Sequence, residues 1–137
     1  MKTKLPAKTT TRLAWAVALA ALVSHANAAT PSEMLARYAA QAGAPAQPER
    51  GQQLFTSRHG REWSCSSCHG AVPVQIGKHA ATGKAIGAMA VAANAERFTD
   101  AAKVEKWFRR NCNDVMGREC TPAEKADVLA WLIALKP

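Results

Sequence analysis

The sequence predicts one small all-α domain of four or five helices. A capping box with proline at the first helical position occurs at Thr30–Glu33 and again at Thr121–Glu124. A further helix start at Thr99–Asp100 precedes apolar residues at helical spacing. No run of alternating polar and apolar residues flanks residues 65–69, so no strand is indicated there. A chain of 137 residues suits a single domain behind a short leader.

The N-terminus has the pattern of a secretory signal peptide. A segment with four basic residues precedes the apolar stretch Leu13–Val23, and a small-x-small site ends at Ala28. The apolar stretch is too short to span a bilayer. We therefore expect residues 1–28 to be a cleaved signal and residues 29–137 to be the domain. We place the mature chain in the periplasm, without membrane insertion.

The helices of the domain are expected in the following order. The first runs from about Pro31 to Gln41 and is followed by a Gly- and Pro-rich breaker. A second begins near Pro48 or Glu49 and carries Leu54 and Phe55. The stretch from Gly70 to Ala95 is rich in glycine with weak periodicity, and we expect a loop there with at most a short helical turn.

Two amphipathic helices complete the domain. The penultimate helix is expected from Asp100 to about Arg110, with Val104, Trp107 and Phe108 on one face. The last helix should end near Leu135. Its expected buried face consists of Val128, Leu129, Leu132 and Ile133, and Trp131 flanks that face.

The motif Cys65-Ser66-Ser67-Cys68-His69 is the pattern of covalent attachment of a c-type haem. Two thiols three residues apart lie on one side of a helical turn and can join the two vinyl groups of one porphyrin edge. The histidine that follows can bind the iron as an axial ligand. The motif therefore predicts one haem c held by Cys65, Cys68 and His69.

Two other interpretations of the motif are weaker. A thioredoxin-like pair should stand near a β-α-β pattern, and none is visible. A zinc site needs two more ligands at a familiar spacing, but the remaining cysteines, Cys112 and Cys120, are separated by seven residues. In an oxidising compartment these two most simply form a disulfide, with a free redox-active pair as the alternative.

The positive charge of the chain does not indicate nucleic-acid binding. The formal net charge is +8, and the four basic residues of the signal account for half of it. Haem propionates would lower the remainder. A mildly positive surface is still able to steer an acidic redox partner.

The residue opposite His69 decides what the iron does. Methionine or a second histidine makes an electron carrier, whereas an open or weakly filled position binds small gases. Met116 lies 47 residues beyond His69, a spacing typical of the methionine ligand in small class I cytochromes c. Met89, His59 and His79 are further candidates, and from chemistry alone an asparagine would not be chosen.

Three segments, Phe98–Trp107, Arg110–Asn113 and Gly117–Asp127, resemble the sphaeroides haem protein family of small periplasmic oxygen-binding c-type cytochromes. The likeness extends upstream through Ala42–Ala46, Glu49–Gly51, the haem motif and Thr82–Lys84. It covers nearly the whole domain and implies a class I cytochrome c-like fold around one haem.

The resemblance also implies a mechanism. The asparagine before the first disulfide cysteine is the ferric distal ligand in that family, which corresponds to Asn111, with Cys112–Cys120 as the disulfide. Release of Asn111 on reduction then opens a site for O₂, NO or CO. Met89 stands where the type protein has leucine and is the first alternative ligand, followed by Met116.

The resemblance further implies redox partners, namely a dihaem cytochrome c and a membrane cytochrome b. The rival function is a plain electron carrier with no external ligand. An O₂ or NO reductase ranks last, because no dedicated proton-delivery residue is evident near the distal side.

Overall fold

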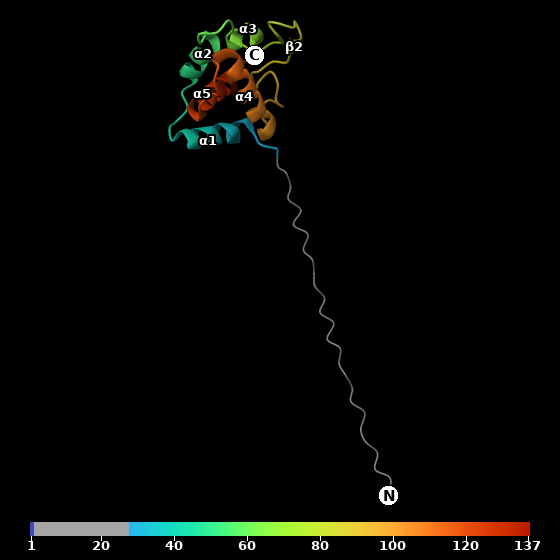
Figure 1. The fold of residues 1–137 in the computed structure, drawn as a ribbon. Helices are drawn as coiled ribbons and strands as arrows, with labels where there is room; N and C mark the ends of the chain where they lie inside the picture. The colour runs from blue at the N-terminus through green and yellow to red at the C-terminus, as the bar shows by residue number, and fades with distance from the viewer. Residues whose placement is uncertain (2–27) are drawn as a thin grey trace.

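Helix α5 (Pro122–Ala134) forms the centre of the fold, and two helices from the beginning of the domain pack against it. In the computed structural model, which describes Met1 and residues 28–137, these are α1 (Pro31–Ala42) and α2 (Pro48–Thr56). Figure 1 shows α5 lying between α1 on one side and α2 and the short α3 on the other. The predicted signal peptide lies outside the described residues, apart from its two ends. No helix within the described part is long and apolar enough to cross a membrane.

The predicted capping boxes start α1 and α5. The Thr30 hydroxyl accepts a hydrogen bond from the Glu33 N–H at 3.1 Å, and the Glu33 carboxylate accepts one from the Thr30 N–H at 2.7 Å. Thr121 and Glu124 repeat this pair at 3.2 and 2.8 Å. Each box satisfies two N–H groups that a helix start would otherwise leave without partners.

Helix α2 is fixed on α5 by a close crossing. A Cβ atom at Gly51 would collide with the backbone carbonyl of Asp127, so only glycine permits this approach. Asp127 itself is 3% exposed, and its carboxylate accepts a hydrogen bond from the Gln47 N–H at 2.6 Å. The same carboxylate pairs with Arg50 at 2.7 Å. A residue of α5 thus caps the N-terminus of α2.

The core consists of two apolar clusters on either side of α5. One joins α1 and α4 to α5 and contains Met34, Tyr38, Val104, Ala126 and Leu129. The other lies beneath α2 and α3 and contains Phe55, Val128, Trp131 and Leu132. Trp131 is therefore a core residue and not, as predicted, a neighbour of the buried face, while Ile133 is only half-buried.

Helix α4 (Ala101–Met116) extends further than predicted. The sequence predicts that this helix ends near Arg110. No strong helix breaker precedes Gly117, however, and Gly117 ends the helix in the left-handed conformation with φ 73°. Asn111 is therefore in the body of the helix and not at its end. Because Asn111 is within the helix, the helical repeat fixes the face of α4 on which its side chain lies.

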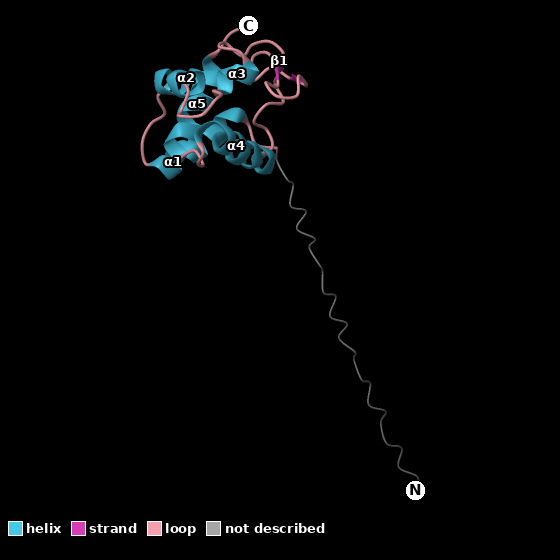
Figure 2. Ribbon diagram, turned by 45° about the horizontal axis from the view of Figure 1, so that its top comes forward, coloured by secondary structure: helices cyan, strands magenta, loops and turns pink. Residues whose placement is uncertain are grey.

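The segment between α2 and α4 carries α3 (Cys65–His69) and a small hairpin of β1 (Gly77–Lys78) and β2 (Ala85–Ile86). The hairpin replaces the plain loop that was expected, because the His79 N–H and the Lys84 carbonyl close its turn at 2.8 Å. Figure 2 shows the hairpin beside α3. The all-α prediction is confirmed, since these two-residue strands are the sole sheet in the described part of the chain.

Candidate haem site

The C-x-x-C-H motif forms the single helical turn α3. The Ser67 hydroxyl accepts a hydrogen bond from the Ser64 N–H at 3.0 Å, which closes the N-terminal end of the turn. Gly70 follows His69 with φ 82° and directs the chain out of the helix. Cys65 and Cys68 are both free thiols and half-buried. One helical turn therefore holds two thiols and one imidazole, as the motif predicts.

The two thiols have different surroundings. Cys65 packs against the cluster that contains Phe55 and Trp131. Burial raises the pKa of the Cys65 thiol to about 11, so it is protonated at neutral pH. The Cys68 sulfur accepts a hydrogen bond from the Ala80 N–H at 3.3 Å, which ties α3 to the hairpin turn.

The imidazole of His69 is uncharged and lacks a protein partner at one nitrogen. Its Nδ1 is buried and makes no hydrogen bond among the described residues. Burial, together with smaller electrostatic contributions from Arg97 and His79, lowers the pKa of His69 to about 4. The ring is therefore neutral at pH 7, the state in which imidazole binds a metal.

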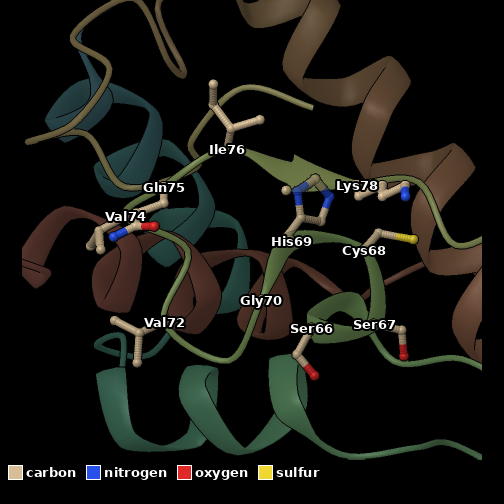
Figure 3. Close-up of a pocket in the computed structure, with 11 residues that line it drawn as sticks. Ser66, Ser67, Cys68, His69, Gly70, Val72, Val74, Gln75, Ile76 and Lys78 are labelled. Atoms are coloured by element: carbon tan, nitrogen blue, oxygen red, sulfur yellow. The ribbon is translucent and has the colours of Figure 1, made fainter. Parts of the chain in front are cut away.

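A cavity of about 550 Å³ borders Cys68 and His69. Its wall is the segment after the motif, with Val72, Val74 and Ile76, of which Ile76 is 76% exposed. Figure 3 shows Cys68 and His69 on the side of α3 that faces β1, with Ser66 and Ser67 pointing away. Strand β1 lies directly on α3, because a Cβ atom at Gly77 would collide with the Cys68 carbonyl.

These residues fit a c-type haem. The two free thiols match two thioether links, the neutral His69 matches an axial ligand, and the exposed apolar wall matches a macrocycle that needs apolar cover. Among the described residues no group of three or more His, Cys, Asp and Glu gathers as a conventional metal site.

Asn111 lies on the inward face of α4. A helix repeats every 3.6 residues, so Val104, Phe108, Asn111 and Val115 form one stripe. Val104 and Val115 are buried, Phe108 packs in both core clusters, and Asn111 is half-buried among them. The Asn111 carboxamide makes no hydrogen bond to another described residue, whereas the amide of Asn113, on the outer face, donates to the Arg109 carbonyl at 2.7 Å.

The backbone of Met89 is hydrogen-bonded to the segment that follows His69. Its N–H donates at 3.0 Å to the carbonyl of Pro73, four residues after His69. Its side chain packs against the cluster that contains Phe55, whose ring centroid lies 6.0 Å from that of His69. Met89 thus packs against the same apolar cluster as Cys65.

The other candidates are engaged elsewhere. Nε2 of His59 lies 2.8 Å from the Leu54 carbonyl. Nδ1 of His79 accepts hydrogen bonds from the Ala81 and Thr82 N–H groups at 3.3 Å. Cys112 of α4 and Cys120 are joined in a disulfide with a Cα–Cα distance of 5.6 Å, and the sulfur of Met116 rests on it.

Two partly buried basic side chains were not identified from the sequence. Arg97, half-buried before α4, donates hydrogen bonds to the carbonyls of Gly87 and Ala88. Lys125, 12% exposed, pairs with Glu105 at 2.8 Å and lies over the rings of Tyr38 and Phe108. No local sequence pattern marked Arg97 or Lys125.

Comparison with known proteins gives a consistent set of relatives. The family model for a domain of unknown function, DUF1924, matches residues 41–132. The cytochrome c-type protein SHP of Cereibacter sphaeroides is 52% identical over 109 residues, which span 77% of this chain and 84% of that protein.

Two solved structures resemble this one closely. Oxidized SHP, described as an oxygen-binding cytochrome c, has a TM-score of 0.74 at 51% identity and covers 78% of this chain and 98% of its own. The solution structure of cytochrome c'' from Methylophilus methylotrophus, described in terms of haem-ligand detachment, has a TM-score of 0.67 at 34% identity. It covers 78% of this chain and 94% of its own.

Proposed function

The chain belongs to the SHP family of c-type cytochromes, and from this premise we propose that it is a periplasmic monohaem cytochrome whose distal site opens on reduction. Family membership confirms the predicted haem c and the predicted cytochrome c-like fold. In our proposal Cys65 and Cys68 carry the haem, His69 is the constant axial ligand, and Asn111 is the exchangeable one.

His69 is suited to permanent ligation. Its neutral ring is held by a helical turn whose two thiols are within the same five residues. With haem bound, its two covalent links to Cys65 and Cys68, together with Phe55 beside the ring, would keep the imidazole in position. A ligand held this way does not depend on the oxidation state of the iron.

Asn111 is suited to reversible ligation. Haem iron, when bound, supplies a site that accepts hard ligands more readily as Fe(III) than as Fe(II). The carboxamide oxygen of Asn111 is a neutral, hard donor and is not committed to another hydrogen bond within the described chain. Its binding in the ferric protein and its release in the ferrous protein would therefore break no protein hydrogen bond.

The observation that carries this proposal is the position of Asn111 on the inward stripe of α4. The disulfide at the next residue, Cys112, holds that turn of the helix to the start of α5. The disulfide thus restrains the backbone of the ligand, while no hydrogen bond to a described residue restrains its side chain. A restrained helix with an unrestrained carboxamide would give a gate that opens without unfolding.

The relatives support the same function. SHP is described as oxygen-binding, and work on cytochrome c'' concerns haem-ligand detachment. By analogy, the open site of this chain takes O₂, NO or CO. The plain-carrier alternative requires Met89 or Met116 as a ligand. The packing of the Met89 side chain in an apolar cluster and of the Met116 sulfur on the disulfide weighs against it.

Electron delivery from a dihaem cytochrome c and a membrane cytochrome b remains part of the proposal. Trp107 does not share the inward face of α4 with Val104 and Phe108, as was predicted, but lies on the outer face, where it is 44% exposed. Arg110 lies 5.5 Å and Lys106 6.0 Å from its ring. A basic surface around an exposed aromatic residue suits an acidic redox partner. Association should then slow as ionic strength rises.

The spin state of the ferric protein tests the role of Asn111. Asn111→Ala should replace an amide-ligated ferric spectrum with one of water-ligated or five-coordinate iron. Asn113→Ala, on the outer face of the same helix turn, is the matched control and should leave the spectrum unchanged. Identical ferric spectra for wild type and Asn111→Ala would exclude Asn111 as the ligand.

A further inference from the structure

Arg97 carries a charge that the described chain does not neutralise. The ion pairs of arginine within residues 28–137 join Arg50 to Asp127, Arg110 to Asp114 and Arg118 to Glu124, and none includes Arg97. Arg97 is nevertheless half-buried, and this burial lowers the pKa of its guanidinium. A partly desolvated cation without a counter-ion is unfavourable, so its presence requires an explanation.

The guanidinium is held in place by backbone carbonyls. Its Nε donates to the Ala88 carbonyl at 2.7 Å and its Nη2 donates to the Gly87 carbonyl at 2.5 Å. These two bonds fix the plane of the group and leave its remaining N–H donors unused. Carbonyl oxygens orient the charge but do not cancel it.

The same two carbonyls place Arg97 beside the haem site. Gly87 and Ala88 directly precede Met89 and Ala90, whose N–H groups both donate to the Pro73 carbonyl at 3.0 Å. Pro73 follows His69 by four residues, and the Met89 side chain shares an apolar cluster with Cys65. The segment that orients Arg97 is therefore bound to the segment that leaves the C-x-x-C-H turn.

A haem brings two carboxylates to such a site, in its propionate groups. The planar fork of arginine binds a carboxylate through two parallel hydrogen bonds, and a partly buried site strengthens them. From the fixed orientation of the guanidinium, its place beside α3 and its lack of an acidic partner, we infer that Arg97 binds a haem propionate. Arg97 thereby ties the loop of residues 87–97 to the macrocycle. This inference needs only the haem and is independent of the role of Asn111.

Resonance Raman spectroscopy of the purified holoprotein tests the inference, because the propionate bending band responds to hydrogen bonding of the carboxylate. Arg97→Gln should shift this band and lower the reduction potential, since an unpaired propionate stabilises Fe(III). Arg97→Lys should restore most of the potential while leaving the band shifted, because lysine keeps the charge and loses the fork. Arg37→Gln removes the same charge from the exposed face of α1 and should change neither quantity.

An unchanged propionate band in Arg97→Gln would overturn the inference. Arg97 would then only hold its own loop together through its bonds to the carbonyls of Gly87 and Ala88. If that variant fails to incorporate haem, the carbon monoxide complex of the wild-type ferrous protein, which is diamagnetic, decides the matter after labelling with ¹⁵N-arginine. Through-space NMR contacts between the Arg97 guanidinium protons and the propionate methylene protons are expected. Their absence, with the guanidinium protons observed, would also overturn it.

Discussion

The sulfur of Met116 lies 3.5 Å from the Sγ atom of Cys120. Since Cys120 is oxidised in a disulfide, this is a packing contact between sulfurs and not a hydrogen bond. Met116 is the last residue of α4 and rests on the disulfide, while Asn111 faces the core from the same helix. The methionine whose spacing from His69 is typical of a ligand is thus part of the structure that anchors α4.

Replacing either methionine should leave iron ligation unchanged. Met116→Leu and Met89→Leu each retain apolar volume, so we expect stability losses below about 1.5 kcal/mol. The ferric charge-transfer band of thioether ligation should be missing in the wild type and in both variants. Loss of such a band in one variant alone would identify that methionine as the ligand and make the protein a plain electron carrier.

The haem should remain attached to the denatured chain. Both Cys65 and Cys68 are free to form thioethers on one helical turn. A haem-peroxidase stain after denaturing electrophoresis should therefore mark the band of the purified protein. Cys65→Ser combined with Cys68→Ser should abolish the stain, and extraction of wild-type haem into acidified organic solvent would refute covalent attachment.

The disulfide should stabilise the fold and the position of Asn111. Denatured protein should show no titratable thiol, because Cys65 and Cys68 are consumed by haem and Cys112 is bonded to Cys120. Replacing both Cys112 and Cys120 by serine should cost about 2–3 kcal/mol in the free energy of unfolding, the value for a short closed loop. The same variant should raise the fraction of ferric iron open to added ligands. Two free thiols in the wild type would contradict the pairing.

Asp127 should contribute to stability through the cap on α2. Asp127→Ala removes the partner of the Gln47 N–H and of Arg50, and we expect a loss of about 1–3 kcal/mol in chemical denaturation. Most of this loss should come from the buried acceptor, because half-exposed Arg50 adds little. Asp114→Ala, an exposed carboxylate on α4, is the control and should cost less than about 0.5 kcal/mol. Equal losses in the two variants would show that the cap is unimportant.

Features with local causes were predictable from the sequence. The capping boxes that start α1 and α5 and the C-x-x-C-H turn each depend on residues three or four positions apart. The end of α4 was predicted wrongly, near Arg110, although the helix continues to Met116 and the signal for its end is Gly117. The hairpin was missed because two-residue strands have no periodicity.

Features with distant causes were not predictable. The bond between Gln47 and Asp127 joins residues 80 positions apart, and no local pattern marks it. Arg97 is oriented by backbone carbonyls, which every residue possesses. Whether Asn111 faces the interior depends on where α4 ends, and the sequence predicted that end too early. The candidates Met89, Met116 and Asn111 could therefore not be separated by position. The family resemblance indicated Asn111, and the inward position of that residue on α4 now gives a physical reason for it.

Carbon monoxide binding followed by stopped-flow absorbance, paired with the ferric spectrum of the same sample, tests the gate most directly. We predict high-spin six-coordinate iron in the oxidised protein. After reduction, the observed rate should rise in proportion to the carbon monoxide concentration, because Asn111 has already left. Asn111→Ala should bind carbon monoxide at nearly the same rate when reduced and should differ from the wild type only when oxidised. A low-spin ferrous protein whose binding rate reaches a plateau would contradict the account, since a resident ligand would then have to dissociate first.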